Sequence, residues 1–232
     1  MKILAVDTSS FAASAAIVED GIVLGESVIR NKRKHSQNIM PMIGRMFTEL
    51  EMNIRDIDLF AVTTGPGSFT GLRIGISTMR AFAQAMGKPI IGINTLEAIA
   101  YNFVCSEHIV VPMLDARRDE VFTAAYRFDG ETPVALIEPC VMTIDGISSE
   151  FTDKTVIYAG DGMIAHRNEI TRPGAIFSPP NLSETRAASV AALAFLRAGN
   201  GEGVGYNDIQ PVYLRKSQAE REYENKHKES IQ

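Results

Sequence analysis

Tryptophan is absent from the 232 residues, and cysteine and histidine are scarce. The two cysteines, Cys105 and Cys140, stand far apart with no short Cys-x-x-Cys spacing, so neither a zinc site nor a disulfide framework is indicated and reduced thiols are expected. The four histidines are scattered. None has a second histidine three or four positions away, so the sequence predicts no metal site.

Long apolar runs and an excess of positive charge are also missing. Residues 3–6 are too short for the apolar region of a signal peptide. The longest apolar run, within residues 187–196, falls short of the roughly 20 residues that a membrane span needs. The net charge of −5 argues against a broad nucleic-acid-binding surface, which is normally basic. We therefore expect a soluble cytoplasmic protein without membrane association.

The hydrophobic pattern predicts an α/β protein whose second half roughly repeats its first. We expect strands followed by alternating helices and strands in each of two units, residues 1–100 and 101–215. The last helix is predicted over 184–198, with Ser183 as its cap. Residues 216–232 are dominated by charged side chains and are expected to form a disordered tail. The pattern alone is as compatible with two unrelated units as with an internal duplication.

A glycine-rich turn within residues 61–83 is the most informative feature. A buried strand breaks at Gly65-Pro66-Gly67, and a helix begins at Ser68. This arrangement points free backbone N–H groups at an anion or at another chain segment. Neither common nucleotide motif fits, because Gly71 is not followed by Lys-Ser/Thr and Thr70 stands where a dinucleotide fingerprint needs glycine.

Polar residues suggest two further places for chemistry. Asp7, Thr8 and Ser9 follow the first strand, and either hold a phosphate or Mg²⁺ or form an ordinary polar turn. The candidate phosphate or structural loop comprises these three residues together with Gly65, Pro66, Gly67, Ser68, Gly71 and Arg73. The second place is the charged cluster of Asp115, Arg117 and Arg118, which is either a solvated loop or part of a cleft between lobes.

Two predicted helices carry apolar or small faces. The first helix, 35–51, has Pro41 near its start, so a late start or a kink is expected. Four of the ten methionines lie between positions 40 and 52, which suits either core packing or an adaptable docking surface. We hypothesise a partner interface that faces solvent in the lone chain and comprises Ile39, Ile43, Met46, Phe47, Leu50, Ile74, Thr78 and Ala81.

A basic segment precedes the first helix. Arg30, Lys32, Arg33 and Lys34 place positive charge where a helix dipole disfavours it. Either these residues lie in a loop clear of the helix, which is the favoured interpretation, or they contact a phosphate backbone.

Ordered sequence blocks resemble one family over about residues 1–215. They are Ala5-Val6-Asp7-Thr8-Ser9, His35-Ser36…Pro41, the glycine block from Gly65 to Gly75, Thr95-Leu96-Glu97-Ala98, Asp115-Ala116-Arg117-Arg118, and Pro211-Val212-Tyr213-Leu214-Arg215. In this order the blocks resemble the TsaB (YeaZ) family, which is related to the TsaD, glycoprotease-like group.

The resemblance implies an actin/Hsp70/sugar-kinase-like fold of two related lobes, each with a mixed sheet flanked by helices. It also implies a role in placing threonylcarbamoyl on the adenosine next to the anticodon, in tRNAs that read codons beginning with A. In that family the chemistry belongs to the paralogue TsaD, with TsaE as an ATPase partner. The chain would then be a non-catalytic subunit that pairs with TsaD through helices 36–51 and 69–86, forms a homodimer when alone, and meets tRNA only indirectly.

Departures from the catalytic relatives agree with such a role. The catalytic paralogues carry two metal-binding histidines four positions apart, whereas this chain has His35 and Ile39. The turn Asp7-Thr8-Ser9 lacks the glycine of nucleotide-binding members, so we expect no catalytic residue, no metal and no cofactor in the chain alone, with ATP or ADP only in the complex. The alternatives are a stand-alone ATP-binding enzyme or glycoprotease-like peptidase, and a tRNA-binding module that uses residues 30–34.

Overall fold

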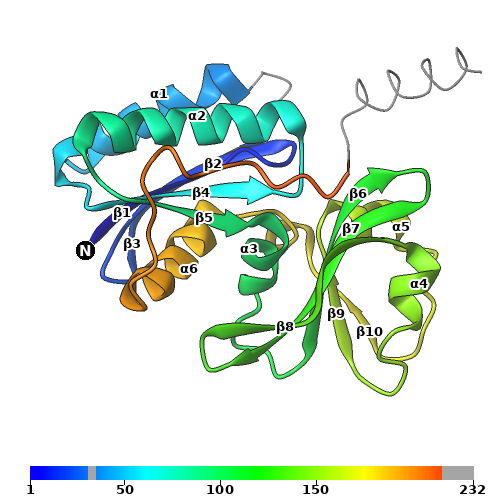
Figure 1. The fold of residues 1–232 in the computed structure, drawn as a ribbon. Coiled ribbons are helices and arrows are strands. Elements are labelled where there is room, and N and C mark those ends of the chain that lie inside the picture. Colours follow the sequence, from blue (N-terminus) through cyan, green and yellow to red (C-terminus); the bar gives the residue numbers. More distant parts are fainter. Residues whose placement is uncertain (31–34, 216–232) are drawn as a thin grey trace, which may run out of the picture.

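Two five-stranded sheets lie side by side in the computed structural model, which describes residues 1–30 and 35–215 (Figure 1). The first sheet has the order β3-β2-β1-β4-β5, and β1 runs antiparallel to β2 and parallel to β4. Its strands are β1 (Lys2–Asp7), β2 (Ala12–Glu19), β3 (Ile22–Arg30), β4 (Leu59–Gly65) and β5 (Ile90–Asn94). The tight β2–β3 hairpin turns on Asp20 and Gly21, both with positive φ, as its two-residue loop requires.

The second sheet repeats this topology. Its order is β10-β9-β6-β7-β8, so three antiparallel strands are again followed by two parallel ones on the far side of the first strand. The strands are β6 (Ile109–Arg117), β7 (Glu120–Asp129), β8 (Thr132–Thr143), β9 (Val156–Ala159) and β10 (Ala175–Phe177). The repetition confirms the predicted α/β fold of the actin/Hsp70/sugar-kinase type, with two related lobes.

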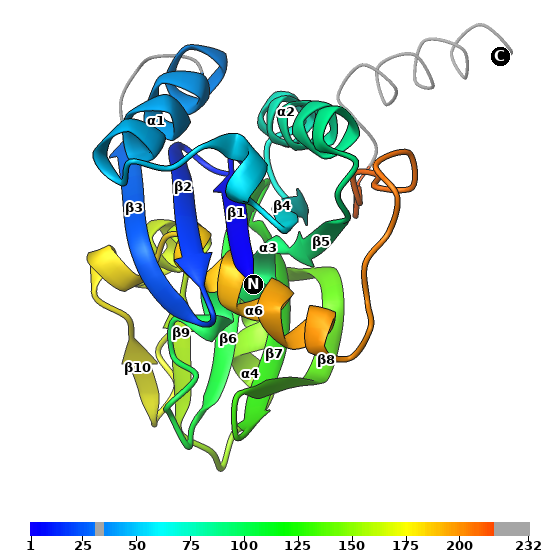
Figure 2. The ribbon, with the colours of Figure 1, turned by 90° about the vertical axis from the view of Figure 1, so that its left-hand side faces the viewer.

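Helices cover both faces of each sheet. In the N-terminal lobe α1 (His35–Glu49) and α2 (Phe69–Met86) share one face, and α6 (Ala187–Gly199) covers the other (Figure 2). In the C-terminal lobe α3 (Thr95–Tyr101) packs on one face, while α4 (Ile144–Ser149) and α5 (Asp161–His166) pack on the opposite side. Two short 3-10 helices, Ile54–Asp56 and Pro180–Leu182, complete the described elements.

Two predicted helix starts differ from the structure. Helix α1 begins at His35 despite Pro41, so no late start occurs, and the proline ring lies on the solvent side. Helix α6 begins at Ala187 rather than at residue 184, and Ser183 does not cap it. Ser183 instead ends the Pro180–Leu182 helix and bonds the Ser178 hydroxyl, because the chain from 183 to 186 crosses between the lobes before it turns helical.

The predicted lobe boundary is wrong at the second crossing. At the first crossing α3 packs between the lobes, with Leu96, Ile99 and Ala100 in the core of the C-terminal lobe and Ala98 in the core of the N-terminal lobe. Residues 187–215 return to the N-terminal lobe, where α6 packs under β1 and β2. The remaining residues, 200–215, which we call the C-terminal strap, add an isolated bridge to β5 and bury Ile209 in the core beneath α2. The tail predicted over 216–232 lies outside the described residues.

Candidate functional site

The glycine block brings the N-terminal end of α2 against the turn that follows β1. A Cβ atom built on Gly71 or on Gly75 would lie inside 3.0 Å of Thr8, closer than real Cβ atoms approach. The Thr8 hydroxyl, itself buried, donates a 2.8 Å hydrogen bond to the Gly71 carbonyl. The small residues on this helix face therefore serve the packing of the chain's own backbone.

Asp7 sits inside this junction rather than at the surface. Its Oδ1 atom accepts hydrogen bonds from the Ser9 N–H (3.1 Å), the Ser9 hydroxyl (2.6 Å) and the Thr63 hydroxyl (2.6 Å). Its Oδ2 atom is buried without a hydrogen-bond partner among the described residues. Burial raises the pKa of Asp7 above its ordinary value, although the bonds from Ser9 and Thr63 oppose the shift.

The raised pKa of Asp7 predicts that the stability of the fold depends on pH. Its folded pKa is raised, so the stability linked to the protonated carboxyl is fully present below the ordinary pKa of 3.8 and is lost as the pH rises through the folded pKa. The variant Asp7→Asn stays neutral, so its free energy of unfolding should gain on the native chain as the pH rises from about 4 to the raised folded pKa of Asp7. Urea unfolding of both chains across this range measures the difference.

The difference in unfolding free energy between Asp7→Asn and the native chain reports on the Asp7 carboxyl alone. Burial also raises the pKa values of Glu97 and Asp161, but these groups are present in both chains and cancel. A stability difference that stays constant with pH would show that the raised pKa of Asp7 has no energetic consequence.

The turn between β4 and α2 is shaped by contacts from two other segments. Gly65 and Gly67 have φ values of 126° and 155°, and the Gly65–Pro66 peptide is cis. A side chain at Gly65 would strike the carbonyl of Val212 in the strap, and one at Gly67 would strike the carbonyl of Ser9. Ser68 caps α2 by accepting the Gly71 N–H at 3.2 Å. The contacts support the structural interpretation of this loop.

The side chain of Arg73, the last residue of the candidate loop, contacts the strap. Its Nε donates a 3.1 Å hydrogen bond to the hydroxyl of Tyr213 in the strap. The Tyr213 ring stacks on Phe69, with centroids 4.1 Å apart and planes at 9°. Arg73 is therefore directed along the outside of α2, toward the strap.

A cleft of about 640 Å³, lined by both polar and apolar residues, lies between the lobes. The N-terminal lobe contributes Ser9, Ser10, Phe11, His35 and residues 67–70, and the C-terminal lobe contributes Leu114, Asp115, Arg117, Phe122 and Asp161. The structure thus brings two of the three predicted cleft residues together with the loop at the start of α2. Hydroxyls, an imidazole, a guanidinium and two carboxylates line this space together with three phenyl rings, so it is chemically suited to a small ligand with both polar and apolar parts.

The hairpin that carries the cleft residues turns sharply. Arg117, Arg118 and Asp119 all have positive φ, between 59° and 66°. The Arg117 N–H donates to Asp115 Oδ1 at 2.7 Å, and the Asp115 N–H donates to Asp161 Oδ1 at 3.1 Å. Arg118 is exposed and is not among the described residues that line the cleft, so the structure separates it from Asp115 and Arg117.

The predicted apolar stripe on α1 faces the sheet, not the solvent. Ile39, Ile43 and Met46 are at most 5% exposed, and Phe47 and Leu50 pack partly buried against the same core. The expectation that this stripe is solvent-facing in the lone chain is wrong, because helical periodicity identifies an apolar face without saying what covers it.

Ile43→Asp is accordingly expected to unfold the protein, because the substitution buries an unpaired charge in the core beneath α1. Loss of the far-UV circular dichroism signal would report the unfolding.

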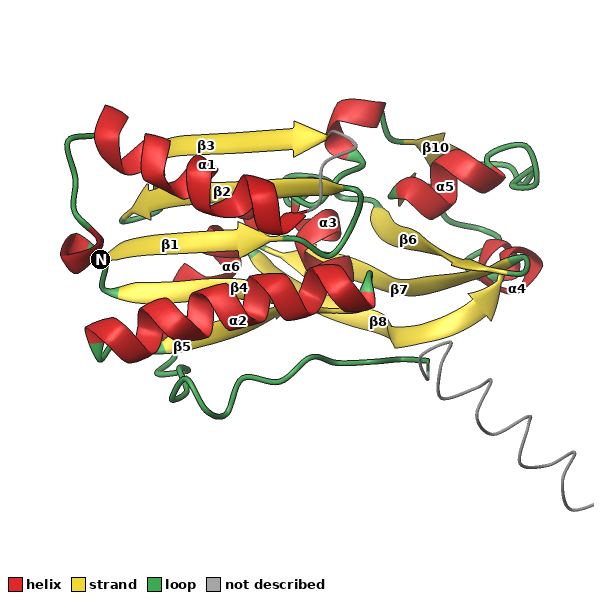
Figure 3. Ribbon diagram, turned by 90° about the horizontal axis from the view of Figure 1, so that it is seen from above, coloured by secondary structure: helices red, strands yellow, loops and turns green. Residues whose placement is uncertain are grey.

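Among the residues that the structure describes, none covers the opposite sides of α1 and α2. The two helices lie next to each other across one sheet, and both turn their outer sides away from it (Figure 3). Eight half-exposed or exposed residues, spaced mostly by three or four positions on each helix, define the helix-pair face: Met40, Pro41, Gly44, Thr48, Ile74, Thr78, Ala81 and Ala85. Three predicted interface residues, all on α2, belong to this face, whereas the four on α1 and Leu50, which follows α1, do not.

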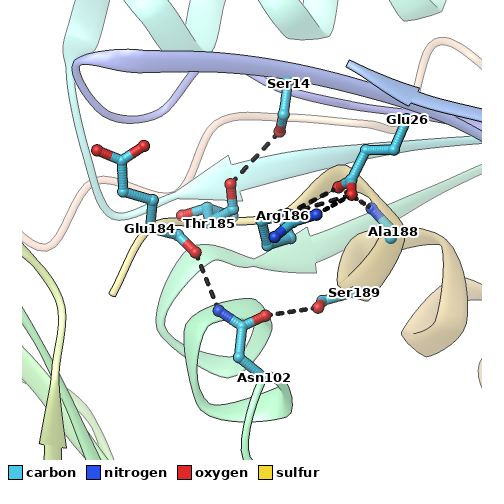
Figure 4. A network of polar contacts seen from close by, with 8 residues as sticks. All are labelled: Ser14, Glu26, Asn102, Glu184, Thr185, Arg186, Ala188 and Ser189. Atoms are coloured by element: carbon cyan, nitrogen blue, oxygen red, sulfur yellow. Dashed lines mark hydrogen bonds and ion pairs between the residues drawn. The ribbon is translucent and has the colours of Figure 1, made fainter. Parts of the chain in front are cut away.

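A polar network holds the inter-lobe crossings in place (Figure 4). The Asn102 amide donates to the carbonyls of Leu182 (2.9 Å) and Glu184 (3.0 Å), and its Oδ1 accepts the Ser189 hydroxyl at 2.7 Å. Glu26 pairs with Arg186 and accepts the Ala188 N–H at 3.1 Å, which ties β3 to the start of α6. One asparagine thus joins the outgoing and returning segments between the lobes.

The strap forms a second connection across the lobes, and sequence reasoning missed it. The Val212 N–H donates to the Thr64 carbonyl at 2.7 Å, which fixes the strap beside β4. Arg215 then reaches the C-terminal lobe, where Nη1 donates to the Ala116 carbonyl at 2.7 Å and Nη2 pairs with Glu120. The block Pro211–Arg215 was the available signal, but nothing in its pattern indicates what it contacts.

Other expected features are reported for the described residues alone. Within residues 1–30 and 35–215, no three His, Cys, Asp or Glu side chains come together as metal ligands. No helix in these ranges has the length and apolar character that crossing a bilayer requires. Of the basic segment, Arg30 pairs with Glu184, and residues 31–34 lie outside the described residues.

Comparisons with known proteins agree on one family. A family model described as TsaD, tRNA N6-adenosine threonylcarbamoyltransferase, matches residues 23–223. A tRNA threonylcarbamoyladenosine biosynthesis protein TsaB from Escherichia coli (strain K12) is 30% identical over 94% of this chain and 96% of its own length. The TsaB protein of Bacillus subtilis (strain 168) is 28% identical over 96% and 98%. The solved structure of YeaZ from Pseudomonas aeruginosa superposes with a TM-score of 0.83 at 27% identity, covering 92% and 99%.

Proposed function

Since the chain belongs to the TsaB (YeaZ) family and has a role in tRNA threonylcarbamoyladenosine biosynthesis, we propose that it is a non-catalytic subunit that binds and supports the catalytic TsaD-type paralogue. The observation that carries the proposal is the helix-pair face. Monomeric proteins normally cover the outer side of a helix pair with polar groups, whereas the eight residues that define this face are small or apolar residues and threonines, with the polar Gln37, Arg45 and Ser77 beside them. Small residues let a partner helix approach closely over both helices.

The other assignments follow from the same role. We propose that the chain works in the cytoplasm with the TsaD-type paralogue and a TsaE-type ATPase, meets tRNA only through the complex, and forms a homodimer through the helix-pair face when alone. The inward bonding of Asp7 and the contact of Gly71 with Thr8 support a loop that organises the lobe. Nucleotide then enters only at the level of the complex, and the chain itself has no catalytic residue.

The test is light scattering after size-exclusion chromatography, on the chain alone and mixed with the TsaD-type paralogue of the same cell. A homodimer that exchanges into a heterodimer is the expected result, because both partners would use the same face. A chain that keeps its own mass in the presence of the paralogue would overturn the proposal.

The inter-lobe cleft supports a second candidate, a stand-alone nucleotide-binding enzyme. The cleft has a mixed polar and apolar lining that includes Arg117, and it measures about 640 Å³, within the usual range for small-molecule sites. Titration calorimetry with Mg-ATP on the isolated chain separates the two candidates. Stoichiometric binding that is lost in Arg117→Ala would favour the enzyme, and absence of heat would leave the subunit role.

A further inference from the structure

A groove of about 640 Å³ runs between α2 and the C-terminal strap. We call it the strap groove. Its helix wall carries residues at positions that share one side of α2, and its other wall is the strap. The residues that matter for its chemistry are Arg73, Ser77, Arg80, Gln84, Gln210 and Tyr213. From residue 73 to residue 84 the helix rises about 16 Å, which is the reach of about five residues of extended chain.

The strap groove is electropositive in a chain whose net charge is −5. Of the described residues that line it, two are arginines and none is aspartate or glutamate. Within residues 1–30 and 35–215, no hydrogen bond or ion pair holds the guanidinium of Arg80, which is half-buried on the helix. Arg80 is thus a charge with no assigned internal partner, beside two side-chain amides, Gln84 and Gln210, that can also donate.

The walls of the groove are fixed before anything binds. Tyr213 stacks on Phe69 and accepts a hydrogen bond from Arg73, so the strap and the helix are joined at one end of the groove. The Val212 N–H bond to Thr64 anchors the strap behind Tyr213. Because the side chains of a preformed groove are already ordered, they lose less conformational entropy when a partner binds.

The groove continues the helix-pair face. Ala81 lines the strap groove and is also part of that face, and Thr78 lies one turn before it on α2. A partner that covers the face therefore meets the groove at its edge. Because the groove lies beside the face, its charges would act mainly on the association rate and on the salt dependence of binding.

We propose that the strap groove receives an acidic segment of the catalytic paralogue, which pairs with Arg80 while helices of both proteins meet on the helix-pair face. This inference rests on the proposed function. A protein segment is favoured over a nucleic acid because two arginines in a chain of net negative charge make too small a basic surface for RNA. A carboxylate is the natural partner of a guanidinium, since the two form parallel charge-assisted hydrogen bonds.

The experiment measures the Kd of the full chain for the paralogue by biolayer interferometry, with Arg80→Glu as the test variant. Arg80→Glu is expected to raise the Kd about tenfold at about 50 mM salt and less than threefold at about 500 mM, because screening weakens exposed ion pairs. Arg127→Glu is the matched control, since this exposed arginine lies on β7 of the C-terminal lobe and gives the same change in net charge. The melting temperature of each variant should equal that of the native chain.

Each outcome decides one question. If the native chain does not bind the paralogue, the proposed function fails and this inference fails with it. If the native chain binds and Arg80→Glu behaves like Arg127→Glu, the subunit role stands and the groove is not the docking site. If Arg80→Glu weakens only self-association, the occupant is a second copy. If it weakens only tRNA binding by the assembled complex, the occupant is nucleic acid. Either of the last two results overturns the inference.

Discussion

Replacing Gly71 with alanine is expected to destabilise the fold by about 3 kcal/mol, an unusually large cost for one methyl group. The added carbon would be forced against the Thr8 carbonyl, which is backbone and cannot rotate away. Relief requires α2 to move off β1, which would stretch the bond from the Thr8 hydroxyl to the Gly71 carbonyl and loosen the core beneath. Urea unfolding monitored by circular dichroism measures the change.

Gly44→Ala provides the matched control. Gly44 is also in the interior of a helix, but nothing lies within 4 Å of a Cβ built there. The substitution should therefore stabilise the fold by about 0.5–1 kcal/mol, through lower backbone entropy in the unfolded chain. Equal effects of the two substitutions would show that the close contact between Gly71 and Thr8 is not the reason why position 71 requires glycine.

Ala81→Asp is expected to weaken pairing with the paralogue by at least about 100-fold while leaving the chain folded. Ala81 is exposed on α2, so the carboxylate is solvated in the lone chain and costs little there. In the complex the carboxylate would lose its hydration against the partner helix and would repel the acidic segment proposed for the strap groove that Ala81 also lines, which is why the loss is large. The measurement is the Kd for the paralogue by titration calorimetry.

Ala165→Asp is the control for this prediction, since Ala165 is an exposed alanine on α5 of the C-terminal lobe. It introduces the same charge far from the helix-pair face and should leave the Kd unchanged. Should Ala81→Asp bind as well as Ala165→Asp, the helix-pair face is not the interface. Failure of Ala81→Asp to fold would instead mean that the lone chain needs this face covered, and its homodimer would then be obligate.

The sequence predicted the local elements well because their signals are local. Short continuous apolar runs mark β1 and β2, and Gly65 and Gly67 mark the turn before α2, where both have the positive φ that glycine permits. The order of such elements left the two-lobed duplication open, and the resemblance to the TsaB family is what favoured it. These features depend on residues close together in the chain.

Apart from the late start expected for α1 from Pro41, the failures concern contacts between distant segments. The stripe of Ile39, Ile43 and Met46 has the same spacing whether a sheet or a second protein covers it, so the sequence could not decide between core and interface. Helix α6 and the strap return to the first lobe from the end of the chain, and their apolar residues do not say which sheet they cover. The roles of Asn102 and Arg215 arise only from that return.

The return of residues 187–215 to the first lobe has a consequence for synthesis. During translation β1 to β5 leave the ribosome early, yet one face of their sheet stays bare until α6 emerges. For most of elongation the nascent chain therefore exposes the apolar side chains of β1, β2, β4 and β5 that α6 later covers. The first lobe is the first to be made and the last to be finished, so this protein is expected to depend on nascent-chain chaperones more than its size suggests.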